Sequence, residues 1–159
     1  MLTLGVHCTS ESAKMPTRST ERAQCIDFYA AEDAVIYAGQ TVVIDLGVKV
    51  VIPEGYGLEF RERSGLASKG IIIGAGIIDE DYHGPLKAVV RYMSHVPPSD
   101  GNLVPGIPSV SIAAGTKIVQ AELVKRIPVD IRKLSATQIE LAIEHSERGE
   151  KGFGSSDER

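Results

Sequence analysis

The sequence contains no tryptophan, only two cysteines and few aromatic residues, which make up 5% of its 159 residues. It has no run of 18 or more apolar residues, so nothing in it predicts a membrane-spanning helix. Cys8 and Cys25 form no CxxC pair and are too few for a disulfide framework, so we interpret them as reduced thiols of a cytoplasmic protein. Residues 1–22 lack a charged segment followed by an apolar one, which argues against a signal peptide.

An excess of positive charge is also absent. The 17 Lys and Arg residues are outnumbered by 21 Asp and Glu residues, which gives a net charge of −4. This balance argues against general binding to nucleic acids or to anionic membranes, but it is compatible with a small phosphorylated ligand held by a few local cations. The length suits one domain. A hydrophobic content of 43% excludes a wholly disordered chain.

The chain does contain many short alternating segments separated by turns. Val42–Ile52 has apolar residues at every second position and predicts one half-buried strand. Residues 64–69 predict one helical turn closed by Gly70. Residues 94–111, rich in proline, predict a loop. Further strands are predicted at 58–63, 71–73, 76–79, 86–93, 118–124 and 127–131, with a glycine-opened hairpin between 71 and 93. We therefore expect an all-β fold with little helix, either a sandwich, a jelly roll or a small barrel.

The C-terminal part of the sequence leaves two structures open. Ser135 and Gln138 fit a helical capping box, whereas the alternation of Ile139, Leu141 and Ile143 fits a strand equally well. Residues 147–159 are charged and rich in glycine and serine, which is typical of a flexible tail. We expect a β-barrel core over residues 1–146 and a mobile C-terminal arm over residues 147–159.

An acidic turn follows the apolar segment that ends at Ile78. Asp79, at the end of that segment, would have a fixed position and a partly dry setting, so it could accept a proton from water as a general base. Tyr82 offers a flat wall against which a sugar or a base could pack. The alternative is an ordinary solvated turn, which the local sequence alone favours.

Two further segments have the composition of phosphate-binding loops. Arg63-Ser64-Gly65 begins the predicted helical turn, where N–H groups, a hydroxyl and a guanidinium suit an anion. Residues 148–156 (RGEKGFGSS) combine small residues with an arginine, hydroxyls and an aromatic ring. A capped turn and a disordered tail are the plain alternatives. Asp27 could hold a hydrated Mg²⁺ through water or be a simple strand-edge carboxylate. The four histidines show no zinc-ligand spacing.

Taken in order, these segments resemble the motifs of the homotrimeric dUTPase family. The match extends over nearly the whole chain, and five motifs in one order are far more specific than any one of them. The matching strings are DFYAAED at 27–33, RSGLASK at 63–69, GAGIIDEDYHG at 74–84, GTKIVQ at 115–120 and RGEKGFGSS at 148–156. Residues 14–18 look like the N-terminal strand of the family.

The resemblance implies a jelly-roll-like β-barrel and the hydrolysis of dUTP to dUMP and pyrophosphate. That reaction keeps uracil out of DNA and supplies dUMP for dTMP synthesis. Asp79 would activate the water that attacks the α-phosphorus, and Asp27 would bind Mg²⁺ through water. The substrate-binding residues that the resemblance implies are Arg63, Ser64, Gly65, Gly76, Ile77, Ile78, Tyr82, Lys87, Gln120, Arg148, Phe153, Gly154, Ser155 and Ser156.

The same resemblance implies a separate role for each group of these residues. The hairpin at 76–78 and the backbone near Lys87 would read uracil, and Tyr82 would pack under the deoxyribose. Arg63–Gly65 and Gln120 would hold phosphates. The arm would come from a different subunit of a homotrimer, with Phe153 stacked over uracil. Neither a nucleic acid nor a membrane is implied as a partner. The location would be the cytoplasm, or the host-cell cytoplasm for a phage protein.

The sequence departs from the family pattern at several positions. Glu62 replaces a proline, Thr116 and Lys117 replace Asp-Arg, and Lys151 replaces a glycine. Residues 96–108 look like an insertion. This insertion is compatible with a second function, that of a nucleotide-gated regulator whose inserted segment binds a protein partner. The related dCTP deaminases have a different second motif and lack the glycine-rich arm, so they match less well.

Overall fold

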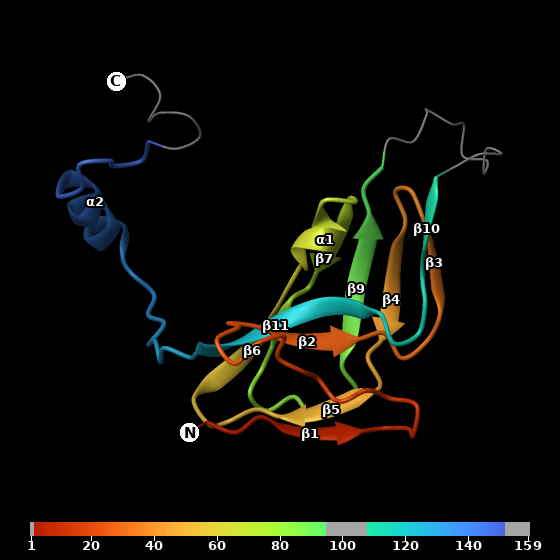
Figure 1. The fold of residues 1–159 in the computed structure, drawn as a ribbon. Helices are drawn as coiled ribbons and strands as arrows, with labels where there is room; N and C mark the ends of the chain where they lie inside the picture. The colour runs from red at the N-terminus through yellow and green to blue at the C-terminus, as the bar shows by residue number, and fades with distance from the viewer. Residues whose placement is uncertain (1, 95–107, 152–159) are drawn as a thin grey trace. The chain divides into compact units, whose positions relative to one another are not determined.

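The computed structural model describes residues 2–94 and 108–151. The chain divides into two units, Met1–Ile127 and Pro128–Arg159, and each is described by itself. Strands dominate the described residues of the first unit, which also contain the short helix α1 (Ser64–Ala67) (Figure 1). The strands are β1 (Gly5–Cys8), β2 (Ile26–Tyr29), β3 (Ala34–Tyr37), β4 (Thr41–Asp45), β5 (Val48–Val51), β6 (Tyr56–Arg61), β7 (Ile71–Gly74), β8 (Ile77–Ile78), β9 (Lys87–Tyr92), β10 (Ser109–Ile112) and β11 (Lys117–Lys125).

The strands form small antiparallel sheets around one core. Their orders are β2-β11-β6-β8, β4-β9-β7, β1-β5 and β10-β3. Most strands pair with partners far away in the sequence, as β11 does with β2 and β6. This confirms the all-β, jelly-roll-like fold with little helix that the sequence predicts.

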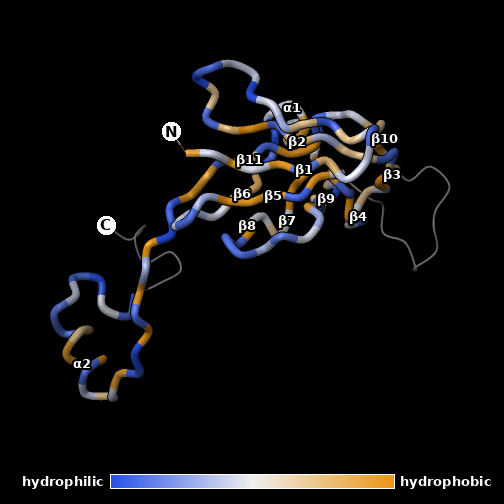
Figure 2. Tube along the Cα trace, turned by 90° about the horizontal axis from the view of Figure 1, so that it is seen from below, coloured by the Kyte–Doolittle hydropathy of each residue, from blue (hydrophilic) through white to orange (hydrophobic). Residues whose placement is uncertain are grey.

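Aliphatic residues fill the core between the sheets. Phe28 and Phe60 are its only buried aromatic side chains among the described residues, and their rings meet edge to face with centroids 5.6 Å apart. In Figure 2 the strands carry most of the hydrophobic colour, while the connecting turns are largely hydrophilic. The chain thus obtains its core from alternate strand residues, as expected for half-buried strands.

The segment Val42–Ile52 is not one strand, contrary to the prediction from its alternation. It forms β4 and β5, which belong to different sheets and are separated by Leu46 and Gly47. Gly47 has a φ of +66°, and a Cβ there would lie 2.9 Å from the Cβ of Ala13. The apolar face stays buried across this corner, so the alternation reported burial correctly but could not show where the chain turns.

The predicted hairpin between residues 71 and 93 is present, but its first arm splits. β7 pairs with β9 from Ile71↔Tyr92 to Gly74↔Val89. The chain then turns at Ala75, which has a φ of +50°, and β8 pairs with β6 instead. The backbone N–H of Phe60 donates to the carbonyl of Gly76 at 2.6 Å, which continues that pairing. The hairpin arms therefore separate beyond Gly74.

Some predicted boundaries were wrong. Residues 109–112 form strand β10 rather than loop, because they pair with β3. Residues 127–131 form no strand. Residues 14–18 contribute only one bridge, Thr17↔Asp27, and the N-terminal strand is β1 instead. The expected strand at 58–63 corresponds to β6, and α1 confirms the helical turn that Gly70 closes.

The second unit contains the helix α2 (Ala136–Glu144). Ser135 and Gln138 form the capping box, and the segment is a helix and not the strand that the alternation also permitted. Residues 147–151 are exposed and have no regular structure. The division after Ile127 differs from the expected core boundary at residue 146, and the mobility of the arm stays a prediction. Within the described residues, no helix combines the length and the hydropathy that crossing a membrane requires.

Candidate active site

The separation of β8 from β9 creates a slot between two strand edges. β8 is the outer strand of its sheet, and β9 pairs with β7 only as far as Val89. A cavity of about 220 Å³ lies here, lined by Ala75, Ile77, Ile78, Asp79, Tyr82, Pro85, Leu86 and Lys87. Unpaired strand edges present backbone N–H and C=O groups in fixed positions. The slot can therefore recognise a flat ligand by hydrogen bonds along its edge.

Four predicted substrate-binding residues and Asp79 come together at this slot. Ile77, Ile78, Tyr82 and Lys87 line it, and Gly76 precedes β8. A Cβ at residue 76 would lie 2.7 Å from the carbonyl oxygen of Phe60, so only glycine lets β8 approach β6 this closely. Ile77 is 77% exposed, which leaves an apolar side chain at the open face of the slot.

Asp79 lies at the mouth of the slot. Its carbonyl accepts the backbone N–H of Tyr82 at 3.1 Å, and the Tyr82 hydroxyl donates to the carbonyl of Pro85 at 3.1 Å. These bonds hold the tyrosine ring across the turn. The side chains of Asp79 and Tyr82 are exposed in the single chain. The partly dry setting expected for Asp79 is therefore not provided by the part of its own chain that the structure describes.

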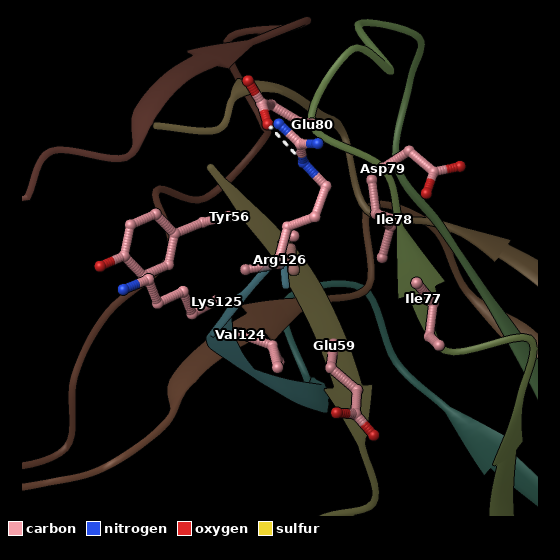
Figure 3. Close-up of a pocket in the computed structure, with 11 residues that line it drawn as sticks. Tyr56, Glu59, Ile77, Ile78, Asp79, Glu80, Val124, Lys125 and Arg126 are labelled. Carbon is pink, nitrogen blue, oxygen red and sulfur yellow. Dashed lines mark hydrogen bonds and ion pairs between the residues drawn. The ribbon is translucent and has the colours of Figure 1, made fainter. Parts of the chain in front are cut away.

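Glu80, next to Asp79, anchors the turn from the other side. Its Oε2 accepts the backbone N–H of Gly55 at 2.9 Å and lies 3.3 Å from Nε of Arg126. In Figure 3, Glu80 turns toward Arg126, while the carboxylate of Asp79 points away from that pair. A second cavity, of about 210 Å³, lies on this side of β8 between Tyr56, Glu59 and Arg126. No local pattern in the sequence predicts this role of Glu80.

A separate polar cluster surrounds Asp27 on β2. Asp27 is the only buried charged residue among those described, and its side chain accepts from three others. Nε of Arg63 lies 2.9 Å from Oδ1, Nζ of Lys117 lies 2.7 Å from Oδ2, and the Ser19 hydroxyl donates to Oδ2 at 2.8 Å. Burial alone raises the pKa of Asp27, but the bonds from Lys117 and Ser19 and the charge of Arg63 hold that pKa below its ordinary value.

Asp27 does not suit the magnesium ion that was expected there. Both of its oxygens already accept hydrogen bonds, and its two ion-pair partners are cations that would repel Mg²⁺. At 5% exposure the residue also leaves no open face for a hydrated ion. Within residues 2–94 and 108–151, no group of three or more His, Cys, Asp or Glu side chains could hold a metal.

The loop that carries Arg63 is tied to neighbouring strands. The side-chain amide of Gln120 donates to the carbonyl of Glu62 at 2.7 Å, and Oε1 of Glu62 accepts the backbone N–H of Ile73 at 3.0 Å. Arg63, at the N-cap of α1, also donates from Nη1 to the carbonyl of Lys117 at 3.3 Å. Ser64 and Gly65 follow in α1. Arg63, Ser64, Gly65 and Gln120 thus lie close together, and their expected role in holding phosphates stays a prediction.

Within one chain, the Arg63 cluster and the Asp79 slot are separate. Ile78 pairs with Leu58 in antiparallel register, so Asp79 continues toward Gly57, whereas Arg63 lies beyond the opposite end of β6. The rise of an extended strand puts them about 20 Å apart. Arg148 belongs to the second unit, and Phe153, Gly154, Ser155 and Ser156 lie outside the described residues, as does nearly all of the predicted insertion at 96–108.

Comparison with known proteins gives the same family throughout. A dUTPase family model matches residues 11–97. The deoxyuridine 5'-triphosphate nucleotidohydrolase of Debaryomyces hansenii is 35% identical over 154 residues, which cover 96% of this chain and 86% of that protein. The mitochondrial human protein of the same name is 31% identical over 148 residues, covering 92% of this chain and 52% of its own length.

Solved structures agree. A mutant dUTPase of Staphylococcus bacteriophage 80alpha with dUpNHpp has a TM-score of 0.79 and 29% identity, over 97% of this chain and 98% of that one. A mutant dUTPase from phage phi11 of S. aureus, described with a coordinated structural Mg(II) ion, has a TM-score of 0.72 and 30% identity, over 83% of this chain and 96% of that one. With the slot, the ordered motifs and these matches in agreement, the chain belongs to the dUTPase family.

Proposed function

We propose that this protein is a dUTP diphosphatase, a hydrolase that converts dUTP to dUMP and pyrophosphate. The observation that carries the proposal is the slot between β8 and the start of β9, with Asp79 at its mouth. The relatives named above are nucleotidohydrolases for the same substrate. The alternative, a nucleotide-gated regulator, is not favoured, since no described residue supports it.

The slot suits a uracil base better than the other pyrimidines. Uracil and cytosine differ in the donors and acceptors along one edge, and fixed backbone groups leave the wrong base with unpaired partners. Ala75, Ile77 and Leu86 narrow the cavity with apolar groups. A thymine methyl group would clash in so narrow a space. Tyr82, held across the turn by Pro85, would pack under a deoxyribose and exclude a 2'-hydroxyl.

Asp79 would act as the general base for the attacking water. The reaction needs one base near the α-phosphorus and several donors to neutralise the triphosphate, rather than covalent chemistry. Arg63, Ser64, Gly65 and Gln120 would supply donors, and Arg148 with residues 153–156 would close over the nucleotide. Because Asp79 is exposed in its own chain, this closure would also remove the bulk water that weakens electrostatic interactions.

Magnesium would enter with the nucleotide. Triphosphate oxygens are ligands that Mg²⁺ prefers, and the ion usually keeps several waters. The substrate would then be the Mg²⁺ complex of dUTP. Asp27 would not bind the ion, because its two oxygens are already paired with Arg63 and Lys117.

The active site would be shared between the subunits of a homotrimer. Neighbouring phosphates in a nucleotide lie only a few ångströms apart, whereas Asp79 and Arg63 of one chain are separated by about 20 Å along β6. They cannot serve the same triphosphate, so the slot of one chain would meet the Arg63 cluster of another. The arm would come from a different subunit than the slot.

Hydrolysis is tested by measuring pyrophosphate release from dUTP and, in separate reactions, from dCTP, dTTP and UTP. We expect rapid release from dUTP with Mg²⁺ and little from the other three. Equal rates for dUTP and dCTP would contradict base reading by the slot, and no release from dUTP would contradict the proposed activity.

The protein would work in the cytoplasm, or in the host-cell cytoplasm if a phage encodes it.

Sharing of the site is tested by mixing two inactive variants. Asp79→Asn and Arg63→Gln chains, unfolded and refolded together, would form mixed trimers. Because a shared site draws its two residues from different chains, about a quarter of the sites would regain both native groups. Mixing would restore that share of activity, whereas variants of a self-contained site would stay inactive in any mixture.

A further inference from the structure

We infer that Asp27 and Lys117 are positioning residues, which together fix the guanidinium of Arg63 in the orientation that receives the triphosphate. The inference rests on the proposed function for its consequence, but not for its geometry. It assigns to Asp27 a role different from the magnesium site expected from the sequence.

The first step is the direction in which Arg63 presents its donors. A guanidinium has five N–H groups in a rigid planar fork. Nε is fixed on Oδ1 of Asp27 at 2.9 Å, and Nη1 is fixed on the carbonyl of Lys117 at 3.3 Å. Bonds at these two nitrogens determine the plane of the fork. Nη2, for which no acceptor is found among the described residues, is left for a ligand, and the side chain is 33% exposed.

The second step is the stability of the carboxylate that holds Arg63. A buried anion persists only when it is well paired, and Asp27 has three donors on its two oxygens. Lys117 supplies a second cation on the oxygen that Arg63 does not use. Lys117 also offers its own backbone carbonyl to Arg63, so the same residue contacts both members of the ion pair.

The third step is the distance of the three residues in sequence. Asp27 is on β2, Lys117 begins β11, and Arg63 follows β6. These strands are neighbours in one sheet, in the order β2-β11-β6. Hydrogen bonds to two strands of this sheet therefore hold the guanidinium of Arg63, whose aliphatic stem alone would leave it free to rotate. This reduces the conformational entropy that a charged side chain loses when it binds a phosphate.

The geometry is tested without any substrate, through the exchange of side-chain protons. In ¹⁵N-labelled protein, the Nε–H proton of Arg63, assigned by its loss in Arg63→Lys, is expected to exchange at least about tenfold more slowly than that of the exposed Arg91. Asp27→Asn and Lys117→Met should each accelerate this exchange, and Lys117→Arg should preserve the protection. Equal exchange at Arg63 and Arg91 in the native protein would overturn the inference, whatever the activity.

The consequence is tested by steady-state kinetics and by binding of dUpNHpp. In Lys117→Met, KM for dUTP and the dissociation constant of dUpNHpp should rise about tenfold, with a smaller change in kcat and with recovery in Lys117→Arg. The Mg²⁺ concentration for half-maximal rate should not change in Lys117→Met or Asp27→Asn.

A metal role for Asp27 predicts the opposite pattern. Removal of the competing cation in Lys117→Met would then lower the Mg²⁺ requirement, and Asp27→Asn would raise it, and either result would overturn the inference. An inactive native protein with protected Arg63 would instead contradict the proposed function and leave the positioning geometry confirmed. Thermal unfolding of each variant separates loss of orientation from loss of fold.

Discussion

Nε of Arg126 lies 3.3 Å from Oε2 of Glu80, although 46 residues separate the two in sequence. The same carboxylate oxygen accepts the backbone N–H of Gly55 at 2.9 Å. Glu80 thereby ties the turn that carries Asp79 to one end of the β6 and β11 pair, where the backbone N–H of Arg126 also donates to the carbonyl of Gly55. The position of the proposed base thus depends on its neighbour.

Glu80→Ala is expected to lower kcat about tenfold, because a small displacement of a catalytic group has a large effect on the rate. Glu80→Gln keeps an acceptor for Gly55 and should lose less. Arg126→Met removes only an exposed ion pair and serves as the control, with a change in unfolding free energy below about 1 kcal/mol. Pyrophosphate release and thermal unfolding are measured in parallel. Equal losses in all three variants would contradict the anchoring role.

Asp79→Asn should leave folding and binding of dUpNHpp nearly unchanged and reduce turnover by at least about a hundredfold, since an amide cannot accept the proton of the attacking water. Asp81→Asn, in the same acidic turn, is the matched control and should retain its rate. Turnover is followed by pyrophosphate release. Undiminished turnover in Asp79→Asn would remove this residue as the base.

Truncation after Glu147 should weaken catalysis far more than stability. The described residues of this segment are exposed and bury little apolar surface, so their loss costs the fold little. A shorter truncation that removes only residues 157–159 is the control. Rates and melting temperatures are compared for the three proteins. A large fall in melting temperature with an unchanged rate would contradict the proposed arm.

Gly76→Ala should weaken both the fold and nucleotide binding, because the new Cβ would lie 2.7 Å from the carbonyl oxygen of Phe60 and would push β8 away from β6. Gly74→Ala is the matched control in the same hairpin, since its Cβ would make an ordinary contact of 3.7 Å with Val89. Urea unfolding and dUpNHpp binding report the two effects. Equal stability of the two variants would show that β8 can move freely.

Acid should selectively remove the contribution of Asp27 to stability. The pKa of Asp27 is lower in the folded protein than its ordinary value, so its carboxylate stabilises the fold above that value and the contribution is lost as the pH falls through the folded-state pKa. The stability difference between the native protein and Asp27→Asn should therefore shrink between about pH 5 and pH 2. Urea unfolding across this range measures it. A difference that grew in acid would contradict the ion pairing.

The sequence by itself determined the fold class and most of the strands. The burial of alternate residues from Val42 to Ile52, the strand β6 and the glycine-closed turn of α1 all follow from local rules of periodicity and glycine geometry. The ordered motifs also indicated which residues gather at the slot and around Arg63. These features are local or depend on a pattern that any partner strand would preserve.

Tertiary structure alone decided the corner at Gly47, the departure of β8 to β6 and the pairing of Asp27. At Gly47, Ala13 and Ala31 leave no room for a side chain, and neither neighbour can be inferred from the alternation around the glycine. Asp27 lies on β2, Lys117 on β11 and Arg63 just after β6, and only the order of these strands in one sheet brings the charges within 3 Å. A carboxylate whose sequence suggested a metal is thereby paired with two cations, because neighbours across a sheet, not neighbours along the chain, set its electrostatic environment.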